Sequence, residues 1–290
     1  MEFEYGRIEQ IAPGVRRVIA NNPSAFTFHG TGTYILGEGK VAVIDPGPLD
    51  PSHIEAILQG VKGEEVSHVL ITHTHMDHSP GYQLMKPECK AVSYGFGPHG
   101  SGKLDDGVKI EEGGDMQFVP DERVSHGDII DGGNWSVECV YTPGHTSNHV
   151  CFQLKEGRIL FTGDHVMGWS TSIVSPPDGD MEAYMNSLDL LLERDDRVYW
   201  PTHGPAITEP KEHVAAFIAH RREREEQILK CVDEGVHIIS EMVPKMYQGT
   251  PEFMYPAAAR SVLAAVEYMI KRGVLVSDQD NLMEARLNKN

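Results

Sequence analysis

The chain has 290 residues and a formal net charge of −18, with four cysteines and no Cys-x-x-Cys pair. This acidity argues against a broad surface for duplex nucleic acid, because negative charge repels a polyanion at long range. No apolar run is long enough to span a bilayer, and the acidic N-terminus lacks the apolar core of a signal peptide. We therefore expect a cytoplasmic protein with free thiols and no membrane partner.

Strand-like and helix-like segments alternate over the first two-thirds of the chain. Residues 41–44 and 66–72 contain short apolar runs that predict buried strands, and residues 51–62 between them carry apolar side chains at helical spacing. A further helix is predicted over 80–86. Hairpins and loops are predicted over 95–134, which is rich in glycine and aspartate.

Three more strand-like segments follow, at 137–141, 150–154 and 158–162. An amphipathic helix is predicted over 180–194, and a last strand over 198–200. This alternation indicates an α/β core.

The pattern changes after residue 205. A long charged helix is predicted over 209–232, and further helices near 238–247 and over 256–272, followed by a short strand at 274–276. Three helices and a strand are typical of a small winged-helix-like unit.

We therefore expect two domains, a catalytic domain over residues 1–208 and a C-terminal helical, winged-helix-like domain over residues 209–290. The cations of the last predicted helix are Arg260, Lys271 and Arg272, which lie at its ends. Such an arrangement makes few phosphate contacts, so we expect this unit to have a structural role or to form a homodimer rather than to read DNA.

Residues 72–78, Thr-His-Thr-His-Met-Asp-His, place three imidazoles and a carboxylate in a short run. Side chains two apart in an extended segment point the same way, so His73 and His75 can bind one ion. Asp77 and His78, past a bend, can face a second ion. Neutral imidazole and carboxylate suit zinc and its first-row neighbours.

Three later segments carry further candidate ligands, each where a predicted strand gives way to a loop. His145 follows Thr-Pro-Gly, Asp164 follows Phe-Thr-Gly, and His203 precedes a glycine in Trp-Pro-Thr-His-Gly. The small neighbours allow the backbone to approach closely. Open α/β sheets also bind ligands at the carboxyl ends of their strands.

These motifs resemble the metallo-β-lactamase superfamily, whose pattern is His-x-His-x-Asp-His, a distant His, a bridging Asp and a last His. The match spans about residues 15–205 and implies a four-layer αββα sandwich. Residues 180–188 and the C-terminal part are similar to the branch that contains β-lactamase-like protein 2, a metal-dependent endoribonuclease. The resemblance therefore implies a metallo-β-lactamase core with a C-terminal winged-helix-like domain.

The resemblance implies a centre of two divalent ions with seven protein ligands. The first ion takes His73, His75 and His145. The second ion takes Asp77, His78 and His203, and Asp164 bridges both ions. Zinc is the expected metal, and manganese, iron and cobalt also suit these ligands.

Two ions on one water lower its pKa enough to hold hydroxide near neutral pH, and this bridging hydroxide is the expected nucleophile. Asp77, or a water that it orients, is a candidate to return the proton to the leaving group. His149 is a second candidate, as a substrate contact or proton donor, although a structural role also accounts for it. Asp45 matches a family position that orients a metal-binding histidine; a simple Asp-Pro-Gly turn explains it equally well.

The resemblance implies hydrolysis of an ester, lactone, thioester or similar bond. True β-lactamases of the superfamily do not use the bridging Asp164, which points away from antibiotic hydrolysis. A single-strand-specific endoribonuclease or phosphodiesterase is the first alternative, and a non-enzymatic regulatory or DNA-binding module the second. An oxidoreductase with two irons would need a flavin or haem partner domain, for which the residues after 205 give no sign.

Four apolar side chains lie in loops near the proposed ligands and are candidates for the wall of a substrate pocket or for the core. They are Phe26, Phe28, Met167 and Trp169.

Overall fold

The structure is a computed structural model, and it describes residues 2–100 and 113–290. It divides into two compact units. The first comprises Met1–Thr142, Ser147–Ser172 and Arg194–Pro210, and the second comprises Pro143–Thr146, Ile173–Glu193 and Lys211–Asn290. The second unit thus takes two short stretches from within the catalytic domain that was expected over residues 1–208.

The first unit contains a seven-stranded sheet whose spatial order follows the chain. Its strands are β1 (Glu9–Ala12), β2 (Val15–Ile19), β3 (Gly32–Leu36), β4 (Lys40–Ile44), β5 (Glu65–Leu70), β6 (Val92–Gly95) and β7 (Glu122–Arg123). Strands β1 to β4 pair antiparallel, and β4 to β7 pair parallel. The parallel connections explain why helices α1 (Pro51–Gly60) and α2 (Gly81–Met85) lie between these strands in the sequence.

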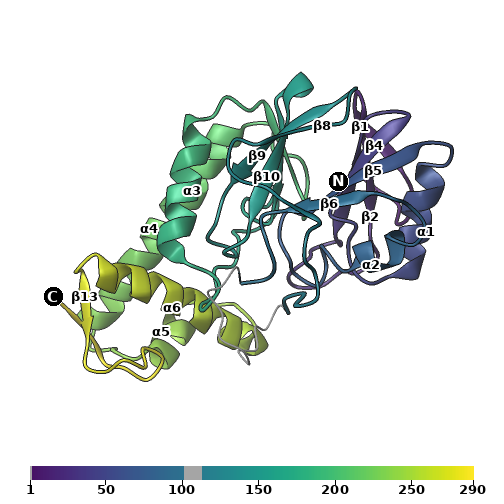
Figure 1. Cartoon of the computed structure of the whole chain (residues 1–290). Helices are drawn as coiled ribbons and strands as arrows, with labels where there is room; N and C mark the ends of the chain where they lie inside the picture. The colour runs from purple at the N-terminus through teal and green to yellow at the C-terminus, as the bar shows by residue number, and fades with distance from the viewer. Residues whose placement is uncertain (1, 101–112) are drawn as a thin grey trace. The chain divides into compact units, whose positions relative to one another are not determined.

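Helices α1 and α2 cover one face of this sheet (Figure 1). Ile54 and Ile57 of α1 share a buried cluster with Ile35, Val43 and Val69 of the strands. Burial of such a side chain contributes roughly 1.5–3 kcal/mol, so this contact holds the two layers together.

A five-stranded sheet with the order β12-β11-β10-β9-β8 completes the first unit. Its strands are β8 (Ile129–Asp131), β9 (Ser136–Tyr141), β10 (Val150–Leu154), β11 (Ile159–Gly163) and β12 (Val198–Pro201), with the short helix η1 at Lys155–Gly157. The inner faces of the two sheets meet in a second buried cluster, to which Tyr34 and Phe161 belong. The Tyr34 hydroxyl donates to the Pro201 carbonyl over 2.6 Å, which fixes one sheet against the other.

The predicted segments agree with these elements to within one or two residues, but β1 to β3 and β6 had no predicted counterpart. Strands β1 to β3 are defined by pairing with one another, and no regular local pattern marks them in the sequence. The region predicted as hairpins and loops contains β7 and β8. Residues 101–112 of that region lie outside the described residues.

The second unit is mainly helical. It contains α3 (Met181–Glu193), most of α4 (Pro210–Asp233), α5 (Ile239–Met246), η2 (Glu252–Met254) and α6 (Tyr255–Lys271). A small antiparallel pair follows, β13 (Leu275–Ser277) with β14 (Leu287–Lys289). Side chains from α4, α5, α6, β13 and β14 form one buried cluster, as expected for a winged-helix-like unit.

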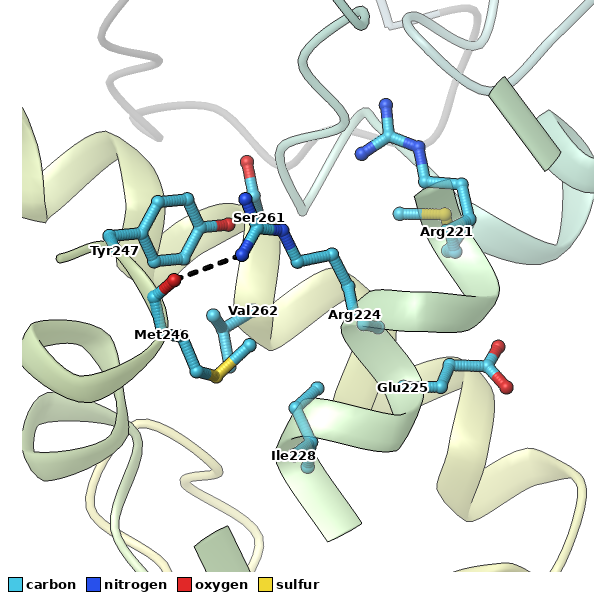
Figure 2. A pocket seen from close by; sticks show the side chains of 10 residues that line it. Arg221, Arg224, Glu225, Ile228, Met246, Tyr247, Ser261 and Val262 are labelled. Atoms are coloured by element: carbon cyan, nitrogen blue, oxygen red, sulfur yellow. Dashed lines mark hydrogen bonds between the residues drawn. The ribbon is translucent and has the colours of Figure 1, made fainter. Parts of the chain in front are cut away.

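Arg224 links helix α4 to the end of α5 within this unit (Figure 2). Its guanidinium lies 4.4 Å from the ring centroid of Tyr247, and its Nη1 donates to the Met246 carbonyl over 3.0 Å. Glu225, the next residue of α4, forms an ion pair with Arg272 over 2.9 Å. Arg224 and Glu225 of α4 therefore help to hold the helices of this unit together.

Within residues 2–100 and 113–290, no helix combines the length and apolarity that a membrane span requires. All four cysteines are free thiols, as the sequence predicted.

Candidate metal centre

Asp45 anchors the start of the histidine-rich run. It follows β4 with a positive φ of 47°, and its backbone N–H donates to the carbonyl of Leu70 on the parallel strand β5. The carboxylate accepts from the Thr72 backbone N–H over 2.8 Å and from the Thr72 hydroxyl over 2.6 Å. The run therefore begins where these two neighbouring strands end.

His78 is fully buried, and its two ring nitrogens face different carboxylates. Nδ1 donates to Asp45 Oδ2 over 2.9 Å. Nε2 has no hydrogen-bond partner among the described residues, yet it lies 3.4 Å from Asp77 Oδ2 and 3.5 Å from Asp164 Oδ2. The bond to Asp45 therefore fixes the ring so that Nε2 points between two carboxylates. This confirms the orienting interaction that the Asp45 position suggested.

His203 approaches the same two carboxylates from the end of β12. Its Nδ1 donates to the Gly30 carbonyl over 3.2 Å. Its Nε2 lies 3.2 Å from Asp77 Oδ2 and 3.3 Å from Asp164 Oδ2. Asp164 directly follows β11, so the ends of two parallel neighbouring strands deliver Asp164 and His203 together.

Four ligand atoms from Asp77, His78, Asp164 and His203 thus converge with the four separations above between 3.2 and 3.5 Å. In a tetrahedral zinc site with bonds of about 2.0–2.1 Å, neighbouring ligand atoms lie about 3.3 Å apart. The buried Nε2 of His78 would be costly without a partner, and a metal ion would supply one. The residues present therefore fit a first-row divalent ion.

His73 and His75 meet as the two-residue spacing predicted. Both are buried, and His73 Nε2 lies 2.9 Å from His75 Nδ1. His73 also belongs, with His78 and Asp164, to a group whose ligand atoms lie within 4.8 Å of one another. The run therefore brings the ligand atoms of His73 and His78 close to Asp164.

His145 belongs to the second unit, on the short stretch Pro143–Thr146. Its Nδ1 donates to the Ile173 carbonyl over 2.6 Å. This bond assigns Nε2 as the ring atom that could bind a metal ion.

The four convergent groups strongly perturb one another's ionisation. Burial would raise the pKa of Asp77 and of Asp164, but His78 and His203 hold both pKa values below the ordinary range. Burial would lower the pKa of His203, but Asp164 and Asp77 outweigh it and raise this pKa to about 10. The same carboxylates raise the pKa of His78 well above its usual value. A divalent ion that binds here must therefore displace protons.

Two supporting residues lie beside these carboxylates. The hydroxyl of Thr31 donates to Asp77 Oδ2 over 2.9 Å, and no motif had singled this residue out. His149 is fully buried; its Nε2 accepts from the Asp164 backbone N–H over 3.2 Å, and its Nδ1 lies 2.9 Å from the Thr142 hydroxyl. These contacts favour a role for His149 in positioning Asp164, and proton donation by His149 stays a prediction.

The four candidate pocket residues divide into two kinds. Met167 is buried, whereas Phe26 and Trp169 are 37% and 36% exposed. Phe28 stacks on Trp169 with ring centroids 5.0 Å apart and an interplanar angle of 15°. Of the four residues, only Phe26, Phe28 and Trp169 therefore reach the surface.

Residues 27–203 match the family model of the metallo-beta-lactamase superfamily. The chain belongs to this superfamily. Residues 239–283 match the beta-lactamase associated winged helix domain. As a metallo-beta-lactamase superfamily member the chain is a hydrolase, and its His and Asp groups could bind metal ions. The expected sandwich with a C-terminal winged-helix-like unit is confirmed.

Two relatives and one solved structure illustrate this membership. A beta-lactamase-like protein 2 homolog from Drosophila melanogaster is 31% identical, covering 92% of this chain and 91% of the relative. An atrochrysone carboxyl ACP thioesterase from Aspergillus chevalieri is also 31% identical, covering 84% and 77%. The crystal structure of a beta-lactamase domain protein from Burkholderia ambifaria superposes with a TM-score of 0.80 at 20% identity, covering 98% of this chain and 94% of that one, and shows the shared fold.

Proposed function

We propose that this chain is a hydrolase that uses two divalent metal ions to cleave a thioester or a similar ester-like bond. Zinc is the expected metal. The observation that carries the proposal is the convergence of Asp77, His78, Asp164 and His203 at ligand-to-ligand distances that suit one ion. His73 Nε2 and His75 Nδ1 lie 2.9 Å apart, and these two histidines would hold a second ion with His145. Asp164 would then be shared between the ions.

Divalent ions held by these residues would lower the pKa of a bound water and would stabilise the anion that develops on an attacked carbonyl. The chain's own groups orient the reaction. Thr31 donates to Asp77 Oδ2 and so orients the carboxylate that is a candidate to return a proton to the leaving group. His149 holds the backbone of Asp164, and Asp45 holds the ring of His78.

The thioester is the favoured substrate class because an atrochrysone carboxyl ACP thioesterase is among the similar proteins. An ester or a lactone presents the same carbonyl chemistry. Single-stranded RNA is the rival substrate, from a different reaction class. The net charge of −18 does not favour a polyanion, although bound metal ions invert the local field.

Metal analysis joined to a substrate panel tests this proposal. We expect two equivalents of transition metal per chain, and hydrolysis of an acyl thioester, ester or lactone that is lost in His75→Ala and Asp164→Asn. Asp189→Asn, at an exposed position of α3, is the matched control and should retain metal and activity. No bound metal together with full activity of His75→Ala would contradict the proposal, and cleavage of unstructured RNA in place of all thioesters and esters would favour the nuclease.

The small-molecule partner, a homodimer and a cytoplasmic location remain predictions. Light scattering and fractionation of cells test the last two.

A further inference from the structure

A row of five aromatic rings lies in the unit that carries the metal ligands of β5, β11 and β12. We call it the aromatic row; it comprises Tyr5, Phe3, His29, Phe28 and Trp169. Neighbouring ring centroids along it are 5.1, 5.3, 3.8 and 5.0 Å apart. Trp169 ends the row, and it remains 36% exposed although Phe28 covers it by stacking.

The Phe28–Trp169 end of the row lies on the two loops that position His203. The Gly30 carbonyl, two residues after Phe28, accepts from His203 Nδ1 over 3.2 Å. The Gly168 N–H, directly before Trp169, donates to the His203 carbonyl over 3.1 Å. Both stacked rings therefore stand within two residues of a hydrogen bond to a candidate metal ligand.

The backbone holds these rings in a fixed place. Phe28 has a φ of +56°, which is unfavourable for a residue with a Cβ, and such strain is concentrated at functional sites. The turn before it is closed by Ser24, whose Oγ accepts from the N–H groups of Phe26 and Thr27, each over 3.1 Å. The stack is therefore a prebuilt surface rather than an adaptable loop.

A close backbone approach fixes Trp169 in the same way. A Cβ at Gly204 would lie 3.0 Å from the backbone nitrogen of Trp169, so a glycine after His203 is what allows the two segments to touch. A side chain here would push the indole away from the metal ligand. The sequence His-Gly at residues 203–204 thus serves both the ligand and the aromatic surface.

We propose that Trp169, backed by Phe28, is a stacking site for a flat aromatic group of the substrate. A second flat ring can extend the parallel stack that Phe28 begins, whereas a compact acetyl group cannot use it. Because this surface lies beside His203, a molecule bound at the metal centre can contact it. The inference rests on the proposed hydrolase function, and it adds the class of substrate: an ester or thioester that carries an aromatic ring.

Paired substrates test the site on the full-length, metal-loaded protein. We expect Trp169→Ala to raise KM for a benzoyl thioester about tenfold relative to an acetyl thioester of the same thiol, with little change in kcat. Trp169→Phe should retain most of the preference because it keeps a flat ring. Phe253→Ala removes an aromatic side chain that is 76% exposed in the second unit, and it should change neither KM. Phenyl acetate and methyl benzoate then show whether the ring belongs to the leaving group or to the acyl group.

Two readouts separate this inference from the proposed function. Metal content equal to that of the wild type in Trp169→Ala shows that the reaction centre is intact. A non-hydrolysable benzoyl thioether analogue, titrated by calorimetry, should bind the wild type and lose about tenfold in affinity in Trp169→Ala even if no thioester is turned over. The inference would be overturned if Trp169→Ala changed KM equally for the benzoyl and acetyl thioesters. It would also be overturned if the variant changed neither KM and bound the analogue as tightly as the wild type. A Trp169→Ala variant that changes only the oligomeric state would overturn it as well, since the row would then be a contact between copies of the chain.

Discussion

His78 donates its Nδ1 hydrogen to Asp45 over 2.9 Å, and this bond turns its Nε2 toward Asp77 and Asp164. Asp45 also accepts from the backbone and the hydroxyl of Thr72, where the histidine-rich run begins. One buried carboxylate therefore sets both the start of the run and the orientation of a candidate ligand six residues later. Outer partners of this kind fix the tautomer of a metal-binding histidine and raise its basicity.

Asp45→Asn should weaken metal binding by about 10- to 100-fold, because an amide NH₂ in place of Oδ2 would face the Nδ1 hydrogen of His78. Asparagine tolerates the positive φ of this residue, so the backbone should remain intact. Competition with a chelator measures the affinity. Asp189→Asn is the control, and equal metal affinity in all three proteins would refute the orienting role of Asp45.

His149→Leu should lower kcat by up to about 100-fold, because the Asp164 backbone N–H loses its acceptor and the carboxylate shifts. His149→Gln should restore much of this activity, since its side-chain oxygen can accept the same hydrogen. The pH–rate profile separates the two roles of His149. A positioning residue leaves the apparent pKa values unchanged, whereas loss of the limb for the protonated group in both variants would identify His149 as the proton donor.

Gly163→Ala should destabilise the fold by more than about 3 kcal/mol, from a left-handed backbone and a steric clash together. Gly163 has a φ of +50°, and a Cβ there would lie 2.6 Å from His149 Nε2 and 2.8 Å from Thr72 Oγ1. Gly39 has a φ of +73° with nothing within 4 Å, so Gly39→Ala isolates the backbone cost of about 1–2 kcal/mol. Urea unfolding of the two variants measures the difference, and equal losses would show that the close approach at Gly163 carries no energy.

His53 should make stability depend on pH below neutrality. Its Nε2 donates to Thr33 Oγ1 over 2.8 Å, since that hydroxyl uses its own hydrogen on the Asp45 carbonyl. Burial lowers the pKa of His53 to about 4 from an ordinary 6.5. The unfolded chain therefore takes up a proton first as pH falls, and the contribution to stability is present above pH 6.5 and lost between about 6.5 and 4, by about 3 kcal/mol.

Urea unfolding at several pH values should show this loss in the wild type and a smaller loss in His53→Gln. His126→Gln, at an exposed histidine, is the control and should follow the wild type. If His53→Gln and the wild type lose stability in parallel, burial of His53 is not the cause.

Most elements of the fold could be predicted because their apolar patterns are local. The run over residues 51–62 and the helix α1 (Pro51–Gly60) agree closely, since helical spacing is set within a few residues. Strands β1 to β3 escaped prediction because they are defined by pairing between segments, which no short run of residues encodes. The position of His145 within the second unit likewise follows from contacts between distant segments, which spacing along the chain does not encode.

The sequence by itself determined the candidate metal ligands: short motifs place His73, His75, Asp77 and His78 within six residues, and a local pattern is enough to mark them. Only the tertiary structure decided how they are used. Asp45 orients His78 so that its Nε2 points toward two carboxylates. The buried His149 accepts a hydrogen bond from the Asp164 backbone. Phe28 stacks on Trp169, next to the segment of His203. Each of these relationships joins segments that are far apart in the chain, and hydrogen-bond direction and ring orientation exist only once those segments have packed together.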